Sequence, residues 1–172
     1  MAKKLFRIAR SRTGLGLFAT AEIKKGAFIA EYKGRRIRNA EADRRPNRYM
    51  FEINNRWTLD GATRRNLARY ANHSCRPNAE SDVKKHKVFL TAKRKIQPGE
   101  EITYDYGKDY FDSYLKPVGC RCDKCRERRR LERSATRRKL RRARERAQRV
   151  AAGTRRKKRA AHVARPARQA RR

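Results

Sequence analysis

Cysteine is the residue of this chain whose number and spacing point most directly to chemistry. Three of its four cysteines, Cys120, Cys122 and Cys125, lie within the six residues "CRCDKC", and the fourth is Cys75. Structural zinc sites hold the ion in a tetrahedron of four ligands, often all thiolates. The count therefore favours one zinc site made by all four cysteines. The alternative is a set of three exposed reduced thiols and one buried thiol.

The stretch around Cys75, "RRNLARYANHSCRPN" (64–78), concentrates other groups that can bind or react. Asn72 and His73 precede the cysteine, and Tyr104 and Tyr106 follow later in "TYDY". Each has a plain alternative, because an Asn-His pair can cap a loop and a strand tyrosine is more often half-buried than catalytic. Only their joint occurrence in one order argues for a functional site.

Charge divides the chain into two parts. The formal net charge is +34, and residues 126–172 hold 22 Lys/Arg against three Asp/Glu, with no aromatic residue. Every Phe, Tyr and Trp lies in residues 1–125, so only this part can bury a core. So large a charge predicts association with polyanions. No membrane span and no secretory signal are expected, so we expect an intracellular protein with reduced thiols.

Short strands are expected to position the candidate site. Turn residues and β-prone runs predict strands within 5–10 and 15–20, at 27–32, in a hairpin over 48–61 that turns at Asn54-Asn55, and on both sides of a Pro98-Gly99 turn within 87–107. One short helix is expected over 39–45, capped by Asn39 and ended by Pro46. The pattern predicts a mainly β fold.

The basic tail has a different composition. From Arg126 the sequence is built from Arg, Ala, Glu and Leu, which favour a helix. Repulsion between like charges is expected to keep that helix loose until a polyanion neutralises it. Residues 153–172, with Gly153 and Pro166, are expected to be disordered, and "RRKKR" (155–159) is typical of a nuclear localisation patch.

The motifs "GLGLFA" (14–19), "NLARYANHSCRPN" (66–78), "GEEITYDYG" (99–107) and the closing cysteine cluster resemble the SET-domain protein-lysine methyltransferases, in order and in spacing. The resemblance covers roughly residues 4–126. It implies a β-clip-like fold of small, curved sheets with a C-terminal pseudoknot, in which the C-terminal segment passes under a preceding loop. The implied organisation is a SET domain over 1–115, a zinc-binding post-SET-like segment over 116–126 and a basic, partly helical or disordered tail over 127–172.

The resemblance also implies an activity, the transfer of a methyl group from S-adenosylmethionine to a lysine side chain. The positions that match cofactor-binding residues are Thr13, Gly14, Leu15, Gly16, Tyr49, Asn72, His73 and Tyr106. Those that match catalytic positions are Tyr106, Tyr104 and Tyr32, and those that match the lysine channel are Tyr32, Phe51 and Tyr104. Tyrosine rather than phenylalanine at 104 suggests mono- or dimethylation. Cys75, Cys120, Cys122 and Cys125 match the post-SET zinc site.

The chain departs from the family pattern at three places. Arg65 stands before Asn66 where the family often has glycine, and the closing cluster is Cys-x-Cys-x2-Cys where Cys-x-Cys-x4-Cys is common. No aromatic residue follows Cys125. Cover for the cofactor is therefore left to Tyr110, Phe111 and Tyr114, or to a partner.

Partners follow from charge and from the resemblance. The expected substrate is a basic protein, either a histone or a nucleoid-like protein, and the tail is expected to bind nucleic acid without sequence specificity. The Ala/Arg usage and small size suggest a bacterial chain, with a nucleoid location, or a nuclear and chromatin location if it is eukaryotic or delivered to a host. Two alternatives stay open: a non-catalytic DNA-compacting protein on a SET scaffold, and a binding module that recruits a partner.

Overall fold

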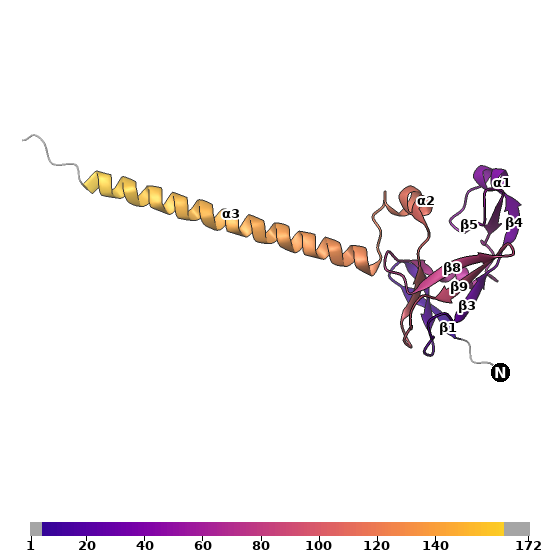
Figure 1. Ribbon diagram of the computed structural model, residues 1–172. Coiled ribbons are helices and arrows are strands. Elements are labelled where there is room, and N and C mark those ends of the chain that lie inside the picture. Colours follow the sequence, from indigo (N-terminus) through magenta and orange to yellow (C-terminus); the bar gives the residue numbers. More distant parts are fainter. Residues whose placement is uncertain (1–4, 164–172) are drawn as a thin grey trace, which may run out of the picture. The chain divides into compact units, whose positions relative to one another are not determined.

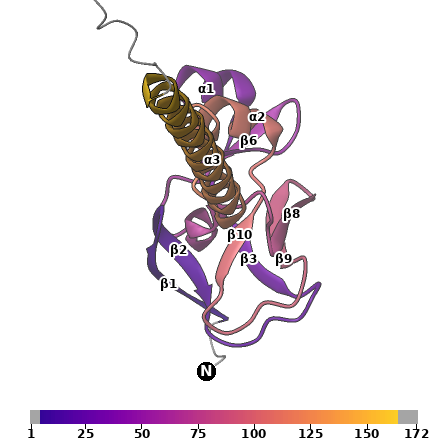
Figure 2. The ribbon, with the colours of Figure 1, turned by 90° about the vertical axis from the view of Figure 1, so that its left-hand side faces the viewer.

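The computed structural model describes residues 5–163, which divide after Arg126 into two compact units. The first unit contains three small sheets, with strand orders β1-β2-β10-β7, β3-β9-β8 and β4-β6-β5 (Figures 1 and 2). Its strands are β1 (Phe6–Ser11), β2 (Gly14–Ala19), β3 (Phe28–Tyr32), β4 (Arg35–Arg38), β5 (Met50–Glu52), β6 (Trp57–Asp60), β7 (Asn72–His73), β8 (Ala79–Lys84), β9 (Lys87–Ala92) and β10 (Glu101–Tyr104). The predicted mainly β fold is confirmed.

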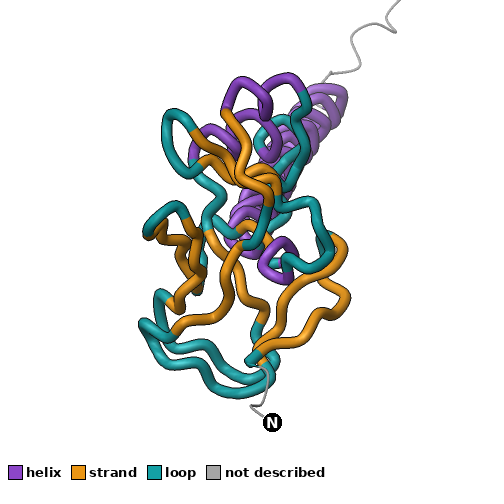
Figure 3. The backbone as a smooth tube through the Cα atoms, turned by 90° about the vertical axis from the view of Figure 1, so that its right-hand side faces the viewer, coloured by secondary structure: helices purple, strands orange, loops and turns teal. Residues whose placement is uncertain are grey.

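Short helical segments lie between these strands or follow β10, and Figure 3 shows the long loops between the elements. They are α1 (Asn39–Arg44), the 3-10 helix η1 (Leu67–Tyr70), α2 (Lys108–Tyr110) and the π-helical turn η2 (Phe111–Leu115). The core that holds the three sheets together is aliphatic. Its fully buried members include Leu17, Ile23, Val88, Leu90, Ile96 and Ile102.

The hairpin predicted over 48–61 is present as β5 and β6. Asn54 makes its turn, because its side-chain oxygen accepts hydrogen bonds from the backbone N–H groups of Arg56 and Trp57, at 2.9 and 3.1 Å. The predicted cap at Asn39 is wrong. Arg38 is the N-cap residue of α1, and the Asn39 side chain instead bonds the carbonyl of Asn54 and the hydroxyl of Thr58. A tertiary contact has thus replaced the local cap.

Strand β10 lies between β2 and β7, the two strands that carry other predicted site residues. It pairs antiparallel with β2 and parallel with β7, with Tyr104 beside His73. The buried Asn78 supports it, because its amide donates to the carbonyl of Glu101 at 2.8 Å and its oxygen accepts from the N–H of Thr103 at 2.8 Å. The "NHSC" segment and the "TYDY" segment therefore lie side by side. The threading of a pseudoknot stays a prediction.

The second unit contains most of one helix, α3 (Asp123–Val163). Helix was expected from Arg126, but the disorder predicted from Gly153 is wrong as far as Val163, because the helix continues through Gly153. Pro166 and the rest of 164–172 lie outside the described residues. Within residues 5–163 no helix is long and apolar enough to cross a membrane.

Candidate active site

A cavity of about 850 Å³ opens where β10, the η1–β7 segment, the β5 strand and the α2–η2 segment meet. This volume is in the range of small-molecule and cofactor pockets. Its lining includes nine residues that the sequence singled out: Thr13, Gly14, Leu15, Tyr32, Tyr49, Phe51, Asn72, Tyr104 and Tyr106. The fold therefore brings residues from five separate stretches of the chain into one cavity.

Tyr106 lies in this cavity with its hydroxyl fixed. The hydroxyl donates a hydrogen bond to the carbonyl oxygen of Ala71 at 2.8 Å, and its ring packs 4.8 Å from that of Tyr104. Burial raises the pKa of Tyr106 above its ordinary value of 10.0. The side chain is therefore a neutral hydroxyl at physiological pH. Its hydrogen points toward the carbonyl of Ala71, and the lone pairs of its oxygen are available to accept hydrogen bonds.

Two further aromatic residues line the cavity beside it. The hydroxyl of Tyr32 donates to the carbonyl of Tyr49 at 2.9 Å, and its ring lies 5.6 Å from Phe51. Burial also raises the pKa values of Tyr32 and Tyr104. The predicted channel residues are thus close together, neutral and largely shielded from water.

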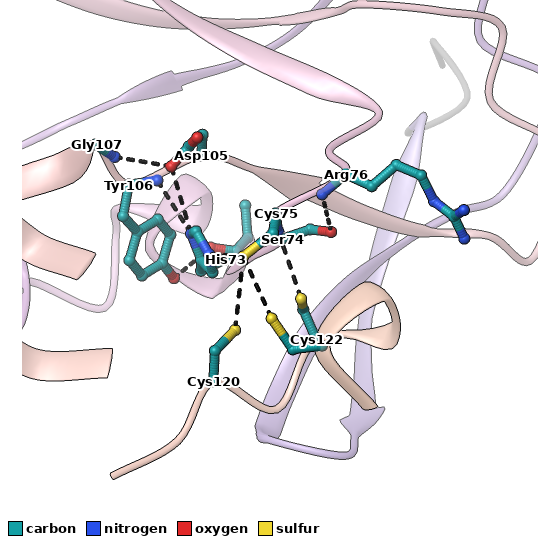
Figure 4. A network of polar contacts seen from close by, with 11 residues as sticks. His73, Ser74, Cys75, Arg76, Asp105, Tyr106, Gly107, Cys120 and Cys122 are labelled. Carbon is teal, nitrogen blue, oxygen red and sulfur yellow. Dashed lines mark hydrogen bonds and ion pairs between the residues drawn. The ribbon is translucent and has the colours of Figure 1, made fainter. Parts of the chain in front are cut away.

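Gly16 and His73 do not line this cavity. A Cβ at Gly16 would lie 2.5 Å from a carboxylate oxygen of Glu101 and 2.9 Å from Cβ of Ser11, so glycine is required there by the packing of β2. The His73 side chain faces the cysteines, with Nε2 3.3 Å from Sγ of Cys75 (Figure 4).

The environment of His73 defines its tautomer. Burial lowers the pKa of His73, although the carboxylate of Asp105, 3.7 Å from Nδ1, opposes this effect. Nδ1 accepts a hydrogen bond from the backbone N–H of Tyr106 at 3.3 Å. A neutral ring that accepts at Nδ1 carries its proton on Nε2, which can then donate to the Cys75 sulfur.

The four cysteine sulfurs form the cluster that the sequence predicted, with all Sγ atoms within 4.8 Å of one another. Sγ of Cys75 lies 4.0 Å from that of Cys120 and 3.6 Å from that of Cys125. Four thiolates about 2.3 Å from a tetrahedral zinc ion are about 3.8 Å apart, so these residues fit zinc despite the short Cys-x2-Cys spacing. Such a site would tie the loop after β7 to the start of α3.

The thiols respond differently to their surroundings. Burial raises the pKa of Cys75 above its ordinary value and that of Cys120 to about 11. Burial also acts on Cys122, but backbone N–H groups of Cys75 and Cys125 outweigh it and lower the pKa of Cys122 to about 7. A divalent cation in the cluster would favour thiolates at all four positions.

Arg69 is a site residue that the sequence reasoning missed. Its guanidinium lies 3.7 Å from the ring centroid of Tyr49 and donates to the carbonyl of Ala62. Its Nε is the one buried side-chain nitrogen or oxygen in the described part of the chain that has no hydrogen-bond partner. An unpaired buried donor on a cation points to an anionic ligand group. The signal was present in "NLARYANHSC", where this arginine lies three residues before Asn72.

Comparison with known proteins agrees with this geometry. The SET domain family model matches residues 14–107. The chain belongs to the SET domain family. The chain is 42% identical over 134 residues to histone-lysine N-methyltransferase 2D of Homo sapiens, and 36% identical over 126 residues to histone-lysine N-methyltransferase trithorax of Drosophila melanogaster.

These alignments cover 70% and 66% of this chain but only 2% and 3% of the two relatives. Histone-lysine N-methyltransferase trr of Drosophila melanogaster is 37% identical over 134 residues, which cover 70% of this chain and 6% of that protein. The chain therefore matches only a small part of much longer proteins. SET methyltransferases use S-adenosylmethionine, and the described residues fit that cofactor at the cavity and zinc at the cysteine cluster.

Proposed function

We propose that this chain transfers a methyl group from S-adenosylmethionine to a lysine side chain of a histone or of another basic DNA-binding protein. The observation that carries the proposal is the arrangement of Tyr106, Tyr104 and Asn72 around one cavity in a SET domain. Relatives named as histone-lysine N-methyltransferases support the substrate class. A chromatin location follows from that substrate.

The cavity offers matched partners for the amino-acid end of the cofactor. The unpaired Nε of Arg69 suits a carboxylate, and the side-chain oxygen of Asn72 suits an ammonium group because both its amide hydrogens are already donated. Thr13, Gly14 and Leu15 contribute the backbone of the β1–β2 turn to the same wall. When bound, the cofactor supplies a methyl group on a positively charged sulfur.

The chain's own residues have three tasks in this reaction. Tyr32, Phe51 and Tyr104 exclude water from the lysine amine, and an apolar environment disfavours the ammonium form, whose pKa in water is about 10.4. Tyr106 orients the reacting groups through the lone pairs of its oxygen, because its hydroxyl hydrogen is used in the hydrogen bond to the carbonyl of Ala71. Burial raises the pKa of Tyr106, so it fits an orienting acceptor better than a base.

Charge in the cavity differs from that of the chain as a whole. The chain is strongly basic, whereas the cavity lining is formally neutral, with three carboxylates (Asp43, Glu52 and Asp109) and three cations (Arg48, Arg69 and Lys108). A carboxylate in a concave site attracts a cation more strongly than the same group on an open surface. The cavity therefore repels a basic substrate less than the rest of the chain does.

The experiment that tests the activity is transfer of tritium from labelled S-adenosylmethionine to core histones, to a bacterial nucleoid protein and to the chain itself. The wild type should label at least one of them, and Tyr106→Phe should label none while retaining cofactor binding. Failure of the wild type both to bind cofactor and to label any protein would favour the non-catalytic DNA-binding alternative. Cofactor binding without any label would overturn the proposed substrate class.

We infer a second function for the tail, which is to hold the enzyme on nucleic acid. Helix α3 places Arg and Lys on all its sides, and its large apolar residues Leu131, Leu140 and Val150 are exposed. Phosphate contacts would relieve its internal repulsion. DNA would also bring a DNA-bound basic substrate to a basic enzyme.

Salt dependence of DNA binding tests this second function. A variant with Arg137, Arg138, Lys139, Arg141 and Arg142 replaced by glutamine keeps helix-forming residues and removes five charges. The slope of log K against log salt should fall by up to about four units. An unchanged slope would assign DNA binding to another surface, and no DNA stimulation of methyl transfer at low salt would contradict the tether.

A further inference from the structure

Four tyrosines form a continuous row at the edge of the cavity. Neighbouring ring centroids lie 4.8 Å apart for Tyr104 and Tyr106, 5.0 Å for Tyr106 and Tyr110, and 4.7 Å for Tyr110 and Tyr114. All four line the cavity. Their exposure rises along the row, from 6% for Tyr104 to 52% for Tyr114. The row therefore leads from solvent to the buried tyrosines of the site.

The outer two members belong to the α2–η2 segment, which is held in place. Gly107, at φ +88°, turns the chain out of β10 immediately before α2. The carboxylate of Asp112 pairs with Lys108 at 2.8 Å and with Lys116 at 3.3 Å, and the hydroxyl of Tyr110 donates to the carbonyl of Arg48 at 3.3 Å. Tyr110 thus joins this segment to the loop before β5, where Arg48 also lines the cavity.

Tyr110 and Tyr114 are the aromatic residues of the α2–η2 segment that line the cavity. Residues 126–172 contain no aromatic residue. Tyr114 is a large side chain that stays half exposed although its ring packs against that of Tyr110. Such a side chain is suited to contact a ligand that arrives from solvent.

We propose that Tyr110 and Tyr114 form the entrance for the substrate's lysine and position its side chain over Tyr106 and Tyr104. This inference rests on the proposed methyltransferase function and deepens it. An aromatic face attracts an ammonium group and replaces part of its hydration, so the row offers the cation a series of favourable positions as water is removed. The two residues then act as substrate-positioning residues, in place of the cover for the cofactor that the sequence suggested for them.

The test compares Tyr114→Leu and Tyr110→Leu with the wild-type full chain, using as substrate whichever basic protein the tritium-transfer experiment labels. Each substitution keeps an apolar side chain and removes the aromatic face. The KM for the protein substrate should rise roughly three- to tenfold, with kcat changed less. The dissociation constant of S-adenosylmethionine, measured separately by calorimetry, should stay within about twofold of wild type.

Two comparisons make the test specific. Tyr114→Phe keeps the ring and should restore most of the wild-type KM, and Val118→Ala, a change at an exposed residue beyond the π-helical turn, should leave both constants unchanged. An active wild type whose KM is insensitive to both leucine variants would overturn the inference while leaving the methyltransferase proposal intact. A weakened cofactor affinity with an unchanged protein KM would assign the row to the cofactor and equally overturn it.

Discussion

The side chain of Asn72 donates hydrogen bonds to the carboxylate of Glu101 at 2.7 Å and to the carbonyl oxygen of Leu15 at 3.1 Å. Because both amide hydrogens are used, the carboxamide oxygen is the atom left to accept. The parallel pairing of β7 with β10 and the antiparallel pairing of β10 with β2 bring these three residues together. The fold thereby fixes which atom Asn72 can offer to a ligand.

Asn72→Asp should therefore weaken the binding of S-adenosylmethionine. The aspartate has no hydrogens to donate, and it places a second carboxylate beside Glu101 and an oxygen against the carbonyl of Leu15. We expect the dissociation constant to rise at least about tenfold, equivalent to about 1.4 kcal/mol. Isothermal titration calorimetry measures it directly.

The matched control is Asn55→Asp, the same chemical change at an exposed position of the β5–β6 turn. It should leave the cofactor affinity within about twofold of wild type. Equal affinities for the two variants, with circular dichroism unchanged, would mean that Asn72 does not contact the cofactor.

The sequence predicted elements where local chemistry decides the structure. The turn at Asn54 was predictable because an asparagine side chain satisfies the backbone two and three residues on, as observed. Strand β8 could not be predicted, because its sequence "AESDVK" does not alternate between apolar and polar residues. Its pairing with β9 uses a turn at Lys85 and His86, both at positive φ, in the place where glycine or asparagine would have signalled a hairpin.

Site residues whose side chains would meet the ligands could be predicted from the motifs. Residues whose place depends on contacts with distant parts of the chain were harder to predict. Tyr106 and Asn72 could be placed from the family motif, but Arg69 also lines the cavity, and its position depends on the Tyr49 ring from the turn before β5. Asn78, in the same motif, supports the backbone of β10 and does not line the cavity. Only tertiary contacts distinguish these two kinds of motif residue.

Replacement of a cluster cysteine should remove one zinc ion per chain. Cys120→Ser leaves three thiols, whose sulfurs cannot complete the tetrahedron. Because metal binding free energy contributes to folding, the midpoint of thermal unfolding should fall by several degrees, and chelation of the wild type should lower it similarly. Elemental analysis and calorimetry measure the two effects. Val118→Ala serves as the control, and full zinc content in Cys120→Ser would contradict a four-cysteine site.

The same substitution at two glycines should have opposite effects. In Gly16→Ala the new Cβ meets Glu101 at 2.5 Å and Ser11 at 2.9 Å, so β2 or β10 must shift and the free energy of unfolding should fall by about 1–3 kcal/mol. In Gly153→Ala the Cβ meets nothing within 4 Å, and alanine favours the helix by about 1 kcal/mol. Denaturant unfolding measures the first, and helical circular dichroism the second. A stable Gly16→Ala variant would show that β2 is not tightly packed on β10.

Glu100 closes the turn before β10 with an unusual number of donors. Its carboxylate accepts hydrogen bonds from Asn78 at 3.0 Å and from the backbone N–H of Gln97 at 3.1 Å, and it pairs with Arg94. Burial acts to raise the pKa of this carboxyl. The donors outweigh burial, so the pKa of Glu100 lies below its ordinary value of 4.5.

The depressed pKa of Glu100 makes its contribution to stability depend on pH. The carboxylate stabilises the fold above pH 4.5, and this stabilisation disappears as the pH falls through the lower, folded-state pKa. Glu100→Gln should therefore lower the free energy of unfolding by about 1 kcal/mol at pH 7, and the difference from wild type should shrink toward zero in strong acid. Urea titrations across this range measure it, with Glu80→Gln on the exposed side of β8 as the control. A difference that persists unchanged at the lowest pH would mean that shape, rather than charge, makes Glu100 necessary.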